Sequence, residues 1–301
     1  MQKGPLTPKG FGDILPETAI KRRKMMNVIA DVLEKYNFSP LETPTIEFAE
    51  TLLGKYGEDE KLIYQFEDKG GRKLALRYDL TVPLARFVAN NLGLLSPKAG
   101  RTPTFSRYQI GQVFRGDNPQ KGRRREFTQF DLDTVGNSDY MEDVNVISAV
   151  IESARAIGLK EAILQINDRE IFDKLGLTSE EVTMIDKIEK IGKVEVEKQI
   201  GSLDRLDAAP KPECLQSIFA ELTKRGLKEN TDFMWNKYLA RGLSYYTSTI
   251  FELKLDKTPG GLSVGGGGRY DNLVGMFAER KIPAVGFSFG IDRIVELITS
   301  A

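Results

Sequence analysis

Apolar residues recur at helical spacing in several parts of the chain. In residues 16–36 they form one stripe, and Pro16 stands in the first turn, where proline favours a helix start. The same spacing predicts helices in three further segments: 79–91, 141–157 and from Ile291 onward. Each stripe indicates a helix that packs one face against a core.

Short extended segments separate these helices. Residues 62–66 and 74–77 flank a turn, Asp68-Lys69-Gly70-Gly71, which predicts a β-hairpin. Residues 38–46 are extended but interrupted by two prolines, a pattern typical of an edge or interface strand. Further strands are predicted in apolar-rich segments: 105–114, 127–135, 162–166, 245–255 and 284–289. The order of elements predicts an α+β fold with a mainly antiparallel sheet flanked by helices.

Between about residues 170 and 232 the sequence pattern changes to that of helices rich in charged residues. Thr178 and Glu181 have the spacing of a capping box at the start of a helix over 178–191. We predict an inserted helical module over 170–232, within a core formed by residues 1–169 and 233–301.

Composition excludes several kinds of chemistry. The 301 residues include no histidine, so a Ser/His or Cys/His pair, a histidine general base and a His-ligated zinc are all impossible. The single cysteine, Cys214, excludes an internal disulfide and is interpreted as a small filler among helices. An enzyme of this composition must act through positioning and charge.

The balance of charge limits the partners. Forty-three basic residues match forty-three acidic ones, so a contact with nucleic acid must be local. A candidate basic stretch, which could equally be a solvated loop, contains seven residues: Arg101, Arg107, Arg115, Lys121, Arg123, Arg124 and Arg125. No apolar run reaches the 18 or more residues of a membrane span, and the N-terminus is polar, so we expect a cytoplasmic protein.

Two groups of polar residues indicate ligand binding. The segment 114–127 places arginines between two strands, which suits phosphate or carboxylate, and Phe127 could offer an aromatic face to a purine. Asp79, Thr81, Gln129 and Asp133 lie in otherwise apolar surroundings. In a strand, Phe127, Gln129, Asp131 and Asp133 share one face. Such a face favours a cationic, donor-rich small ligand, the alternative being a solvent-facing side of the sheet.

Two further segments carry weaker signals. The glycine run 265–268 lacks the Lys-Ser/Thr of a phosphate-binding loop and the spacing of a dinucleotide fingerprint, but it permits close backbone approach. Arg293 stands in the first turn of the last helix, against the helix dipole, which suggests that it is held there for a ligand.

Five motifs in family order resemble the class II aminoacyl-tRNA synthetases, and specifically the histidyl-tRNA synthetases. The segment from Phe114-Arg115 to Arg125-Glu126-Phe127 resembles motif 2, residues 290–293 resemble motif 3, and Pro44 stands where motif 1 has its dimer-interface proline. Residues 241–247 and 266–271 resemble the two histidine-specific signatures of the family. Residues 76–81 also resemble a segment found in histidyl-tRNA synthetases.

The resemblance implies roles for individual residues. Asp79, Thr81 and Gln129 would hold the amino group of histidine, and Asp133 and Tyr246, next to Tyr245, would read the imidazole nitrogens. The catalytic residues would be Arg115, Arg241 and Arg293, with Arg241 between the substrate carboxylate and the α-phosphate. The ATP-binding residues would be Arg115, Asp117, Arg123, Phe127 and Arg293. The implied partners are histidine, ATP with Mg²⁺, the acceptor end of tRNA(His) and a second copy in a homodimer.

Two departures leave alternatives open. Ser244 replaces the usual aspartate of the family, and the chain ends eight residues after Arg293, where the family continues into an anticodon-binding domain. We therefore expect the catalytic domain of such an enzyme. One alternative is a histidine-sensing paralogue that resembles the regulatory subunit of ATP phosphoribosyltransferase. The other is a free-standing enzyme that adenylates histidine for an acceptor other than tRNA.

Overall fold

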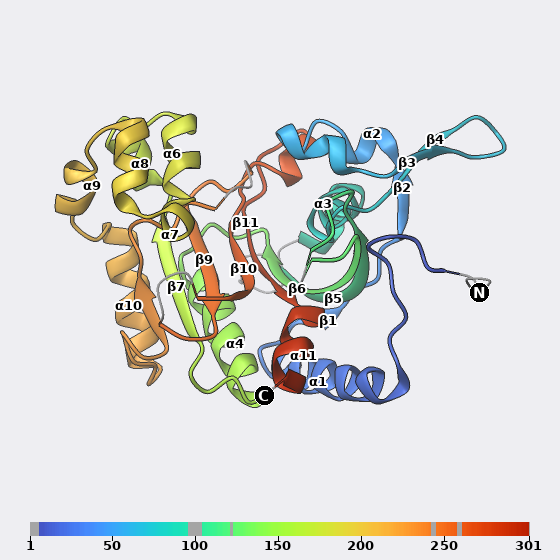
Figure 1. Ribbon diagram of the computed structural model, residues 1–301, viewed down its shortest axis with the longest axis horizontal. Coiled ribbons are helices and arrows are strands. Elements are labelled where there is room, and N and C mark those ends of the chain that lie inside the picture. Colours follow the sequence, from blue (N-terminus) through green and yellow to red (C-terminus); the bar gives the residue numbers. More distant parts are fainter. Residues whose placement is uncertain (1–5, 96–103, 121–122, 242–244, 258–260, 301) are drawn as a thin grey trace, which may run out of the picture.

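A twisted, mainly antiparallel sheet forms the centre of the molecule (Figure 1). The computed structural model describes residues 6–95, 104–120, 123–241, 245–257 and 261–300. Within these ranges eight strands form one sheet, in the order β1 (Ser39–Pro40), β5 (Phe105–Phe114), β6 (Glu126–Val135), β11 (Ala284–Gly290), β10 (Ser263–Arg269), β9 (Thr249–Lys254), β7 (Ile163–Asp168) and β8 (Phe233–Trp235). The outermost pairs, β1 with β5 and β7 with β8, are parallel, and the neighbours between them are antiparallel.

Helices cover one face of this sheet. They are α1 (Pro16–Lys35), α4 (Met141–Ala156), α10 (Glu213–Lys224) and α11 (Ile291–Ser300). Alternate apolar residues of β6 and β11 belong to the same apolar cluster as these helices, among them Phe130, Leu132 and Phe289. Because side chains alternate along a strand, the intervening residues of β6 point to the opposite face. That face carries the site described below, and the predicted fold class is confirmed.

A smaller sheet and two helices lie at one end of the main sheet (Figure 1). The small sheet has the order β2 (Ile46–Phe48), β4 (Lys73–Leu76) and β3 (Gln65–Glu67). Its β3–β4 pair is the predicted hairpin. Between and after its strands lie α2 (Ala49–Leu52), the 3-10 helix η1 (Gly57–Leu62), α3 (Thr81–Asn90) and the 3-10 helix η2 (Leu92–Leu95). They share an apolar cluster with residues that follow β10, including η3 (Val274–Met276).

Five short helices form a separate group between β7 and α10. They are α5 (Glu170–Lys174), α6 (Ser179–Ile185), α7 (Ile188–Ile191), α8 (Lys193–Ile200) and α9 (Asp204–Ala208). They surround an apolar cluster of their own, whereas α10 packs on α4 as part of the larger core. The capping box of Thr178 and Glu181 is present. None of the helices in the described ranges is long and apolar enough to span a membrane.

Several predicted boundaries were wrong. The glycine run, which we did not assign to a strand, lies in the central strand β10, which pairs with β9 and β11. These positions are glycines because neighbouring side chains and backbone fill the space that a Cβ would need. The strand predicted from Tyr245 begins only at Thr249, and the short strand β8 was missed. Residues 38–46 do not form one strand but contribute to both sheets. The helix over 178–191 is two helices, because the chain bends at Asp186 and Lys187.

Candidate functional site

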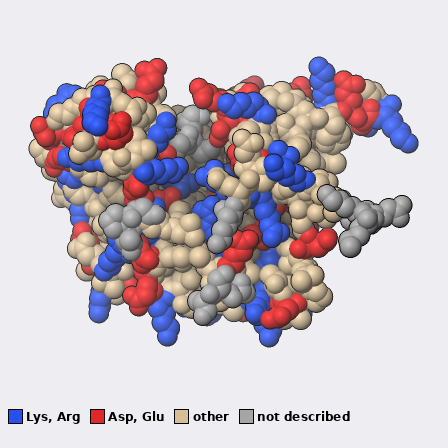
Figure 2. Space-filling model, in the orientation of Figure 1, with Lys and Arg blue, Asp and Glu red and all other residues tan. Residues whose placement is uncertain are grey.

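A cavity of about 1000 Å³ opens on the face of the sheet opposite α1 and α4. Its floor is formed by β6, β10 and β11, and Asp186, Glu189 and Lys190 of the helical group line one side. Basic side chains gather in the hollow that Figure 2 shows at the middle of this face. All twelve residues predicted for the site line this cavity: Asp79, Thr81, Arg115, Asp117, Arg123, Phe127, Gln129, Asp133, Arg241, Tyr245, Tyr246 and Arg293.

One end of the cavity is rich in buried acceptor atoms. Gln129, Asp131 and Asp133 point into it from β6, and Phe127, on the same face of the strand, lines the cavity farther along, as the alternation of the strand predicted. Four oxygen atoms at the acceptor-rich end are buried without a hydrogen bond from the described residues: Asp79 Oδ2, Gln129 Oε1, Asp131 Oδ1 and Asp133 Oδ2, of which the last is ion-paired with Arg107. A buried acceptor without a donor is costly. This end of the cavity, which we call the acceptor pocket, therefore suits a ligand that brings several N–H donors.

The carboxylate of Asp79 is fixed just before α3. Its Oδ1 accepts hydrogen bonds from the Tyr56 hydroxyl at 2.9 Å and from the backbone N–H groups of Thr81 and Val82 at 3.1 and 3.0 Å. These contacts occupy one oxygen and leave Oδ2 without a partner. Burial raises the pKa of Asp79 in spite of these donors.

Arg107 and Tyr270 hold the two carboxylate oxygens of Asp133. The Arg107 guanidinium, which is fully buried, places Nη2 2.7 Å from Asp133 Oδ2, and the Tyr270 hydroxyl donates to Oδ1. Gly286, opposite Asp133 on β11, leaves the room for this carboxylate, because a Cβ there would lie 1.8 Å from Oδ1. Burial raises the pKa of Asp133, and Arg107 opposes that effect.

Asp131 and Gln129 are connected through Ser288. The Gln129 amide donates from Nε2 to Ser288 Oγ at 2.7 Å, so its Oε1 has the acceptor role. Ser288 also hydrogen-bonds to Asp131. Burial raises the pKa of Asp131 to about 7, with Arg107 lowering it and Asp133 raising it. The acceptor pocket is therefore short of positive charge in the absence of a ligand.

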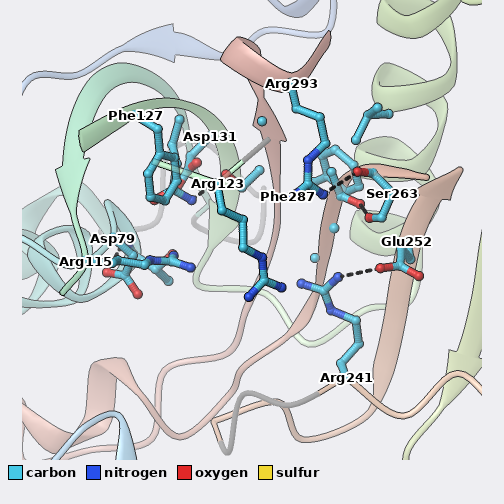
Figure 3. Close-up of a pocket in the computed structure, with 18 of the residues that line it drawn as sticks. Asp79, Arg115, Arg123, Phe127, Asp131, Arg241, Glu252, Ser263, Phe287 and Arg293 are labelled. Carbon is cyan, nitrogen blue, oxygen red and sulfur yellow. Dashed lines mark hydrogen bonds and ion pairs between the residues drawn. The ribbon is translucent and has the colours of Figure 1, made fainter. Parts of the chain in front are cut away.

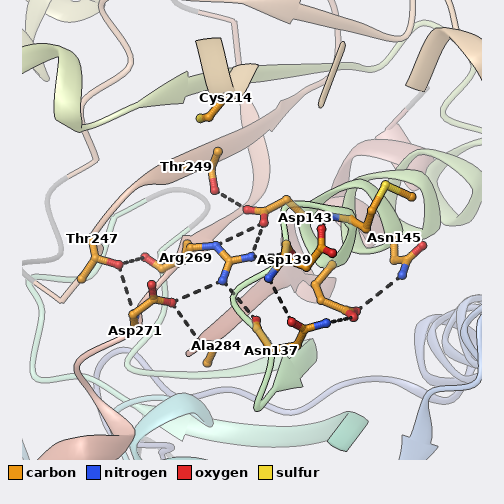
Figure 4. Close-up of polar contacts among 12 residues, drawn as sticks. Asn137, Asp139, Asp143, Asn145, Cys214, Thr247, Thr249, Arg269, Asp271 and Ala284 are labelled. Carbon is orange, nitrogen blue, oxygen red and sulfur yellow. Dashed lines mark hydrogen bonds and ion pairs between the residues drawn. The ribbon is translucent and has the colours of Figure 1, made fainter. Parts of the chain in front are cut away.

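Arg269, at the end of β10, is the centre of a polar network on either side of Tyr270 in the sequence (Figure 4). Arg269 donates to Asp143 of α4, which also accepts from the Thr249 hydroxyl. The same guanidinium lies 3.4 Å from Asp271, whose Oδ1 accepts the backbone N–H of Ala284. These contacts lock the residues on either side of Tyr270, and therefore the direction of its hydroxyl toward Asp133.

Arginines surround the other end of the cavity, where Arg123, Arg241 and Arg293 converge, and Arg115 stands beside Asp79 at the border with the acceptor pocket (Figure 3). Arg115 donates from Nε to the Tyr78 carbonyl at 3.1 Å and lies over the rings of Tyr78 and Phe127, at 4.3 and 5.1 Å from their centroids. Arg293 donates from Nη1 to the Ser263 carbonyl at 2.7 Å. Burial lowers the pKa of Arg293, and the charge of Arg123 adds to that effect. Two guanidinium groups that repel each other across a cavity favour a bound anion.

Arg241 reaches the middle of the cavity from a bend in the chain. Its Nη1 lies 3.5 Å from Glu252 Oε1 on β9, and its guanidinium carbon lies 6.0 Å from the centre of the Tyr246 ring. Gly266 makes this position possible, because a Cβ there would lie 2.0 Å from Nη1. Tyr245 packs against both Tyr246 and Tyr270, with ring centroids 5.0 and 6.0 Å apart.

Comparison with known proteins assigns the family. The family model described as Histidyl-tRNA synthetase matches residues 10–232 and 194–294. The histidine–tRNA ligase of Aeropyrum pernix is 40% identical over 97% of this chain and 74% of its own length. This chain belongs to the histidyl-tRNA synthetase family. It is thus an enzyme of the aminoacyl-tRNA ligase class.

Solved structures agree with this family assignment. The histidyl-tRNA synthetase from Nostoc sp. PCC 7120 superimposes with a TM-score of 0.81 at 27% identity, over 99% of this chain and 76% of that one. A protein from Bacillus halodurans C, titled as an ATP phosphoribosyltransferase regulatory subunit/histidyl-tRNA synthetase, has a TM-score of 0.80 at 22% identity, over 98% and 84%. The second likeness shows the fold alone.

Some predictions of the sequence do not hold within this histidyl-tRNA synthetase fold. Arg107 was placed in the basic stretch that could contact nucleic acid, but it is fully buried, because it neutralises Asp133 beneath the acceptor pocket. Arg101, Lys121 and Ser244 lie outside the described residues.

Cys214 packs at the edge of the larger core as predicted, and its thiol also donates to Asp168 at 2.9 Å.

Several residues that shape the site received no individual role from sequence reasoning. Asp131 was placed on the ligand-binding face with Gln129 and Asp133 by the alternation of β6, but without a role of its own. Arg107 could not be found in this way, because an arginine in a strand is usually a surface residue. Tyr270 and Glu252 become significant only when the register of β9, β10 and β11 is known.

Proposed function

We propose that the chain activates histidine with ATP to form histidyl-adenylate and transfers the histidyl group to tRNA(His). The observation that carries the proposal is the division of one cavity into two ends. Unpartnered buried acceptors lie at one end and several guanidinium groups at the other. A cationic amino acid and a polyphosphate would meet where the two ends join, next to Arg241.

The acceptor pocket would hold histidine. Asp79 Oδ2 and Gln129 Oε1 have no partner and suit the α-ammonium group, with Thr81 beside them. Asp133 and Tyr246 would read the two imidazole nitrogens, and Tyr245 would hold the Tyr246 ring in place. A site built to pair buried polar atoms with a ligand discriminates strongly against ligands that leave those atoms unpaired.

The arginine-rich end would hold ATP. Phe127, under Arg115, offers a ring face to adenine, Arg115 would bind the α-phosphate, and Arg293 would bind the γ-phosphate. Arg123 and Asp117 line the same end. Among the described residues no group of three or more acidic, histidine or cysteine side chains is arranged to hold a metal ion. Magnesium would therefore arrive on the ATP phosphates, as part of the substrate.

Activation needs no general base in this geometry. The carboxylate of histidine is already ionised and attacks the α-phosphorus, and pyrophosphate leaves. Arg115 and Arg241 would stabilise the negative charge that develops on the α-phosphate, and Arg293 would stabilise the leaving pyrophosphate. The absence of histidine from the chain is compatible with this mechanism.

The proposed function also includes an oligomeric state, a division into domains and a location. We infer a homodimer through the segment around Pro44, where a second, shallow pocket lies next to the exposed side chains of Ile46 and Phe48. Residues 1–169 and 233–301 would form the catalytic core and 170–232 the inserted module, of which α5–α9 have their own apolar cluster. The cytoplasm is the expected location, as for translation enzymes generally.

The two alternatives make different use of the arginines. A histidine-sensing paralogue needs the acceptor pocket but has no use for Arg115, Arg241 and Arg293 in the same cavity, so their presence there favours activation. An enzyme that passes the histidyl group to an acceptor other than tRNA would need both the acceptor pocket and the arginine-rich end of the cavity. Charging of tRNA(His) transcript with labelled histidine tests the proposal. Acid-precipitable label on this tRNA and on no other supports it, whereas formation of histidyl-adenylate without charging indicates a different acceptor.

A further inference from the structure

The helical group between β7 and α10 contacts the backbone of Arg241. Arg241 has a φ angle of 58°, in the left-handed region that residues other than glycine rarely adopt. Its backbone N–H donates to Asp186 Oδ1 at 3.0 Å, and Asp186 is the C-cap residue that directly follows helix α6. This contact fixes an unfavourable backbone conformation, and therefore the direction in which the Arg241 side chain leaves the chain.

The same helical group is connected to the Arg241 side chain through a row of ion pairs. Glu189 of α7 lies 2.7 Å from Lys254 Nζ, and Lys254 Nζ lies 3.0 Å from Glu252 Oε2. Glu252 Oε1 lies 3.5 Å from Arg241 Nη1, a contact drawn in Figure 3. We call Glu189, Lys254, Glu252 and Arg241 the charge row.

The position of Lys254 makes this row more than a set of surface pairs. Lys254 is only 5% exposed, and both carboxylates raise its pKa against the effect of burial. A buried ammonium group is costly unless it is paired, and removal of one partner leaves the others to rearrange. Without Glu189, Lys254 would draw Glu252 away from Arg241, because Glu252 would be its remaining carboxylate in the row.

The Arg241 guanidinium has little freedom to adapt to such a change. It lies against the backbone of β10 at Gly266, and Tyr246 lies beneath it. Reaction rates are sensitive to displacements of about 1 Å in a group that stabilises the transition state. A small shift of Glu252 would therefore reach the reacting atoms through Arg241.

We propose that Asp186 and Glu189 are positioning residues for Arg241, which makes the helical group a working part of the activation site. Asp186 sets the backbone of Arg241, and Glu189 sets its guanidinium through Lys254 and Glu252. The inference rests on the proposed role of Arg241 in histidine activation. It follows that a ligand which displaces α6 or α7 would change the rate of activation without entering the cavity.

The test compares three variants of the whole chain in histidine-dependent exchange of pyrophosphate into ATP. Glu189→Gln and Asp186→Ala should lower kcat by about 10- to 100-fold and leave the KM values for histidine and ATP within about twofold. Glu195→Gln is the matched control, since Glu195 pairs with Lys198 at 2.9 Å on the exposed side of α8 in the same helical group. It should keep the parent rate.

A double variant separates positioning from general damage to the fold. If Glu189 acts through Arg241, Glu189→Gln should cause no further loss in an Arg241→Ala background, so the two effects should not be additive. Equal rates for Glu189→Gln and Glu195→Gln, or fully additive losses in the double variant, would overturn the inference. If Glu189→Gln does not fold, Asp186→Ala with Arg241→Ala makes the same comparison. A parent chain with no exchange would instead refute the proposed function.

Discussion

Asp133→Ala should separate histidine binding from ATP binding. The substitution removes the carboxylate that would accept from the imidazole, 2.7 Å from Arg107 and next to Tyr270. A hydrogen bond to a charged group contributes about 1.5–3 kcal/mol, which corresponds to a loss of histidine affinity of roughly 10- to 150-fold. ATP affinity should remain within about twofold, because Phe127 lies six residues from Asp133 along β6 and Arg293 is held by the Ser263 carbonyl of β10.

Titration calorimetry of each ligand separately measures both affinities. Asp133→Asn, which keeps the shape and loses the charge, shows how much of the loss is electrostatic, and Asp173→Ala at an exposed position outside the cavity is the control. Both Asp133 variants should also lower the melting temperature, because Arg107 is left buried without its carboxylate. Equal losses of affinity for histidine and ATP, or no loss for histidine, would show that the imidazole does not bind at Asp133.

Three further predictions concern rate, pH and assembly. Arg241→Ala should reduce histidine-dependent pyrophosphate exchange by about 100-fold or more while ATP still binds, and a loss confined to KM would contradict a role in the transition state. Asp131 has a pKa raised to about 7 by burial, so it stabilises the ligand-free fold most below about pH 4 and loses that contribution as pH rises through about 7. Asp131→Asn should therefore make the melting temperature of the ligand-free chain fall less between about pH 5 and 8, and an unchanged slope would show that this carboxyl is already ionised. Sedimentation at micromolar concentration should show a dimer that Phe48→Glu dissociates, and a monomeric parent would contradict the interface around Pro44.

The parts of the fold that the sequence predicted are those with strong local periodicity. The stripe in α1 and the apolar-rich strands β5, β6 and β11 each form an element of the predicted type, because burying one face decides their conformation. The glycines of β10 carry no such signal. Pairing with β9 and β11 on both sides holds them in a strand, and only glycine fits there because Phe287, the Gly286 carbonyl and the Arg241 guanidinium occupy the space that side chains would need.

Sequence reasoning named residues that line the cavity but not the residues that hold them. The twelve residues named from family motifs and from the alternation of β6 all line one cavity, and their roles stay predictions. Arg107, Glu252 and Asp186 act on those residues from other strands and from a helix more than 50 positions away. Contacts of this kind depend on strand register and on the packing of the helical group, which no local pattern in one sequence encodes.

Histidine-dependent exchange of labelled pyrophosphate into ATP is the decisive measurement for activation by this chain. With the parent chain, ATP, magnesium and histidine, we expect label in ATP at a rate that depends on histidine and is not supported by other amino acids. Tight histidine binding with no exchange would contradict activation, because the arginine-rich end of the cavity would then have no part in it and the histidine-sensing alternative would replace it.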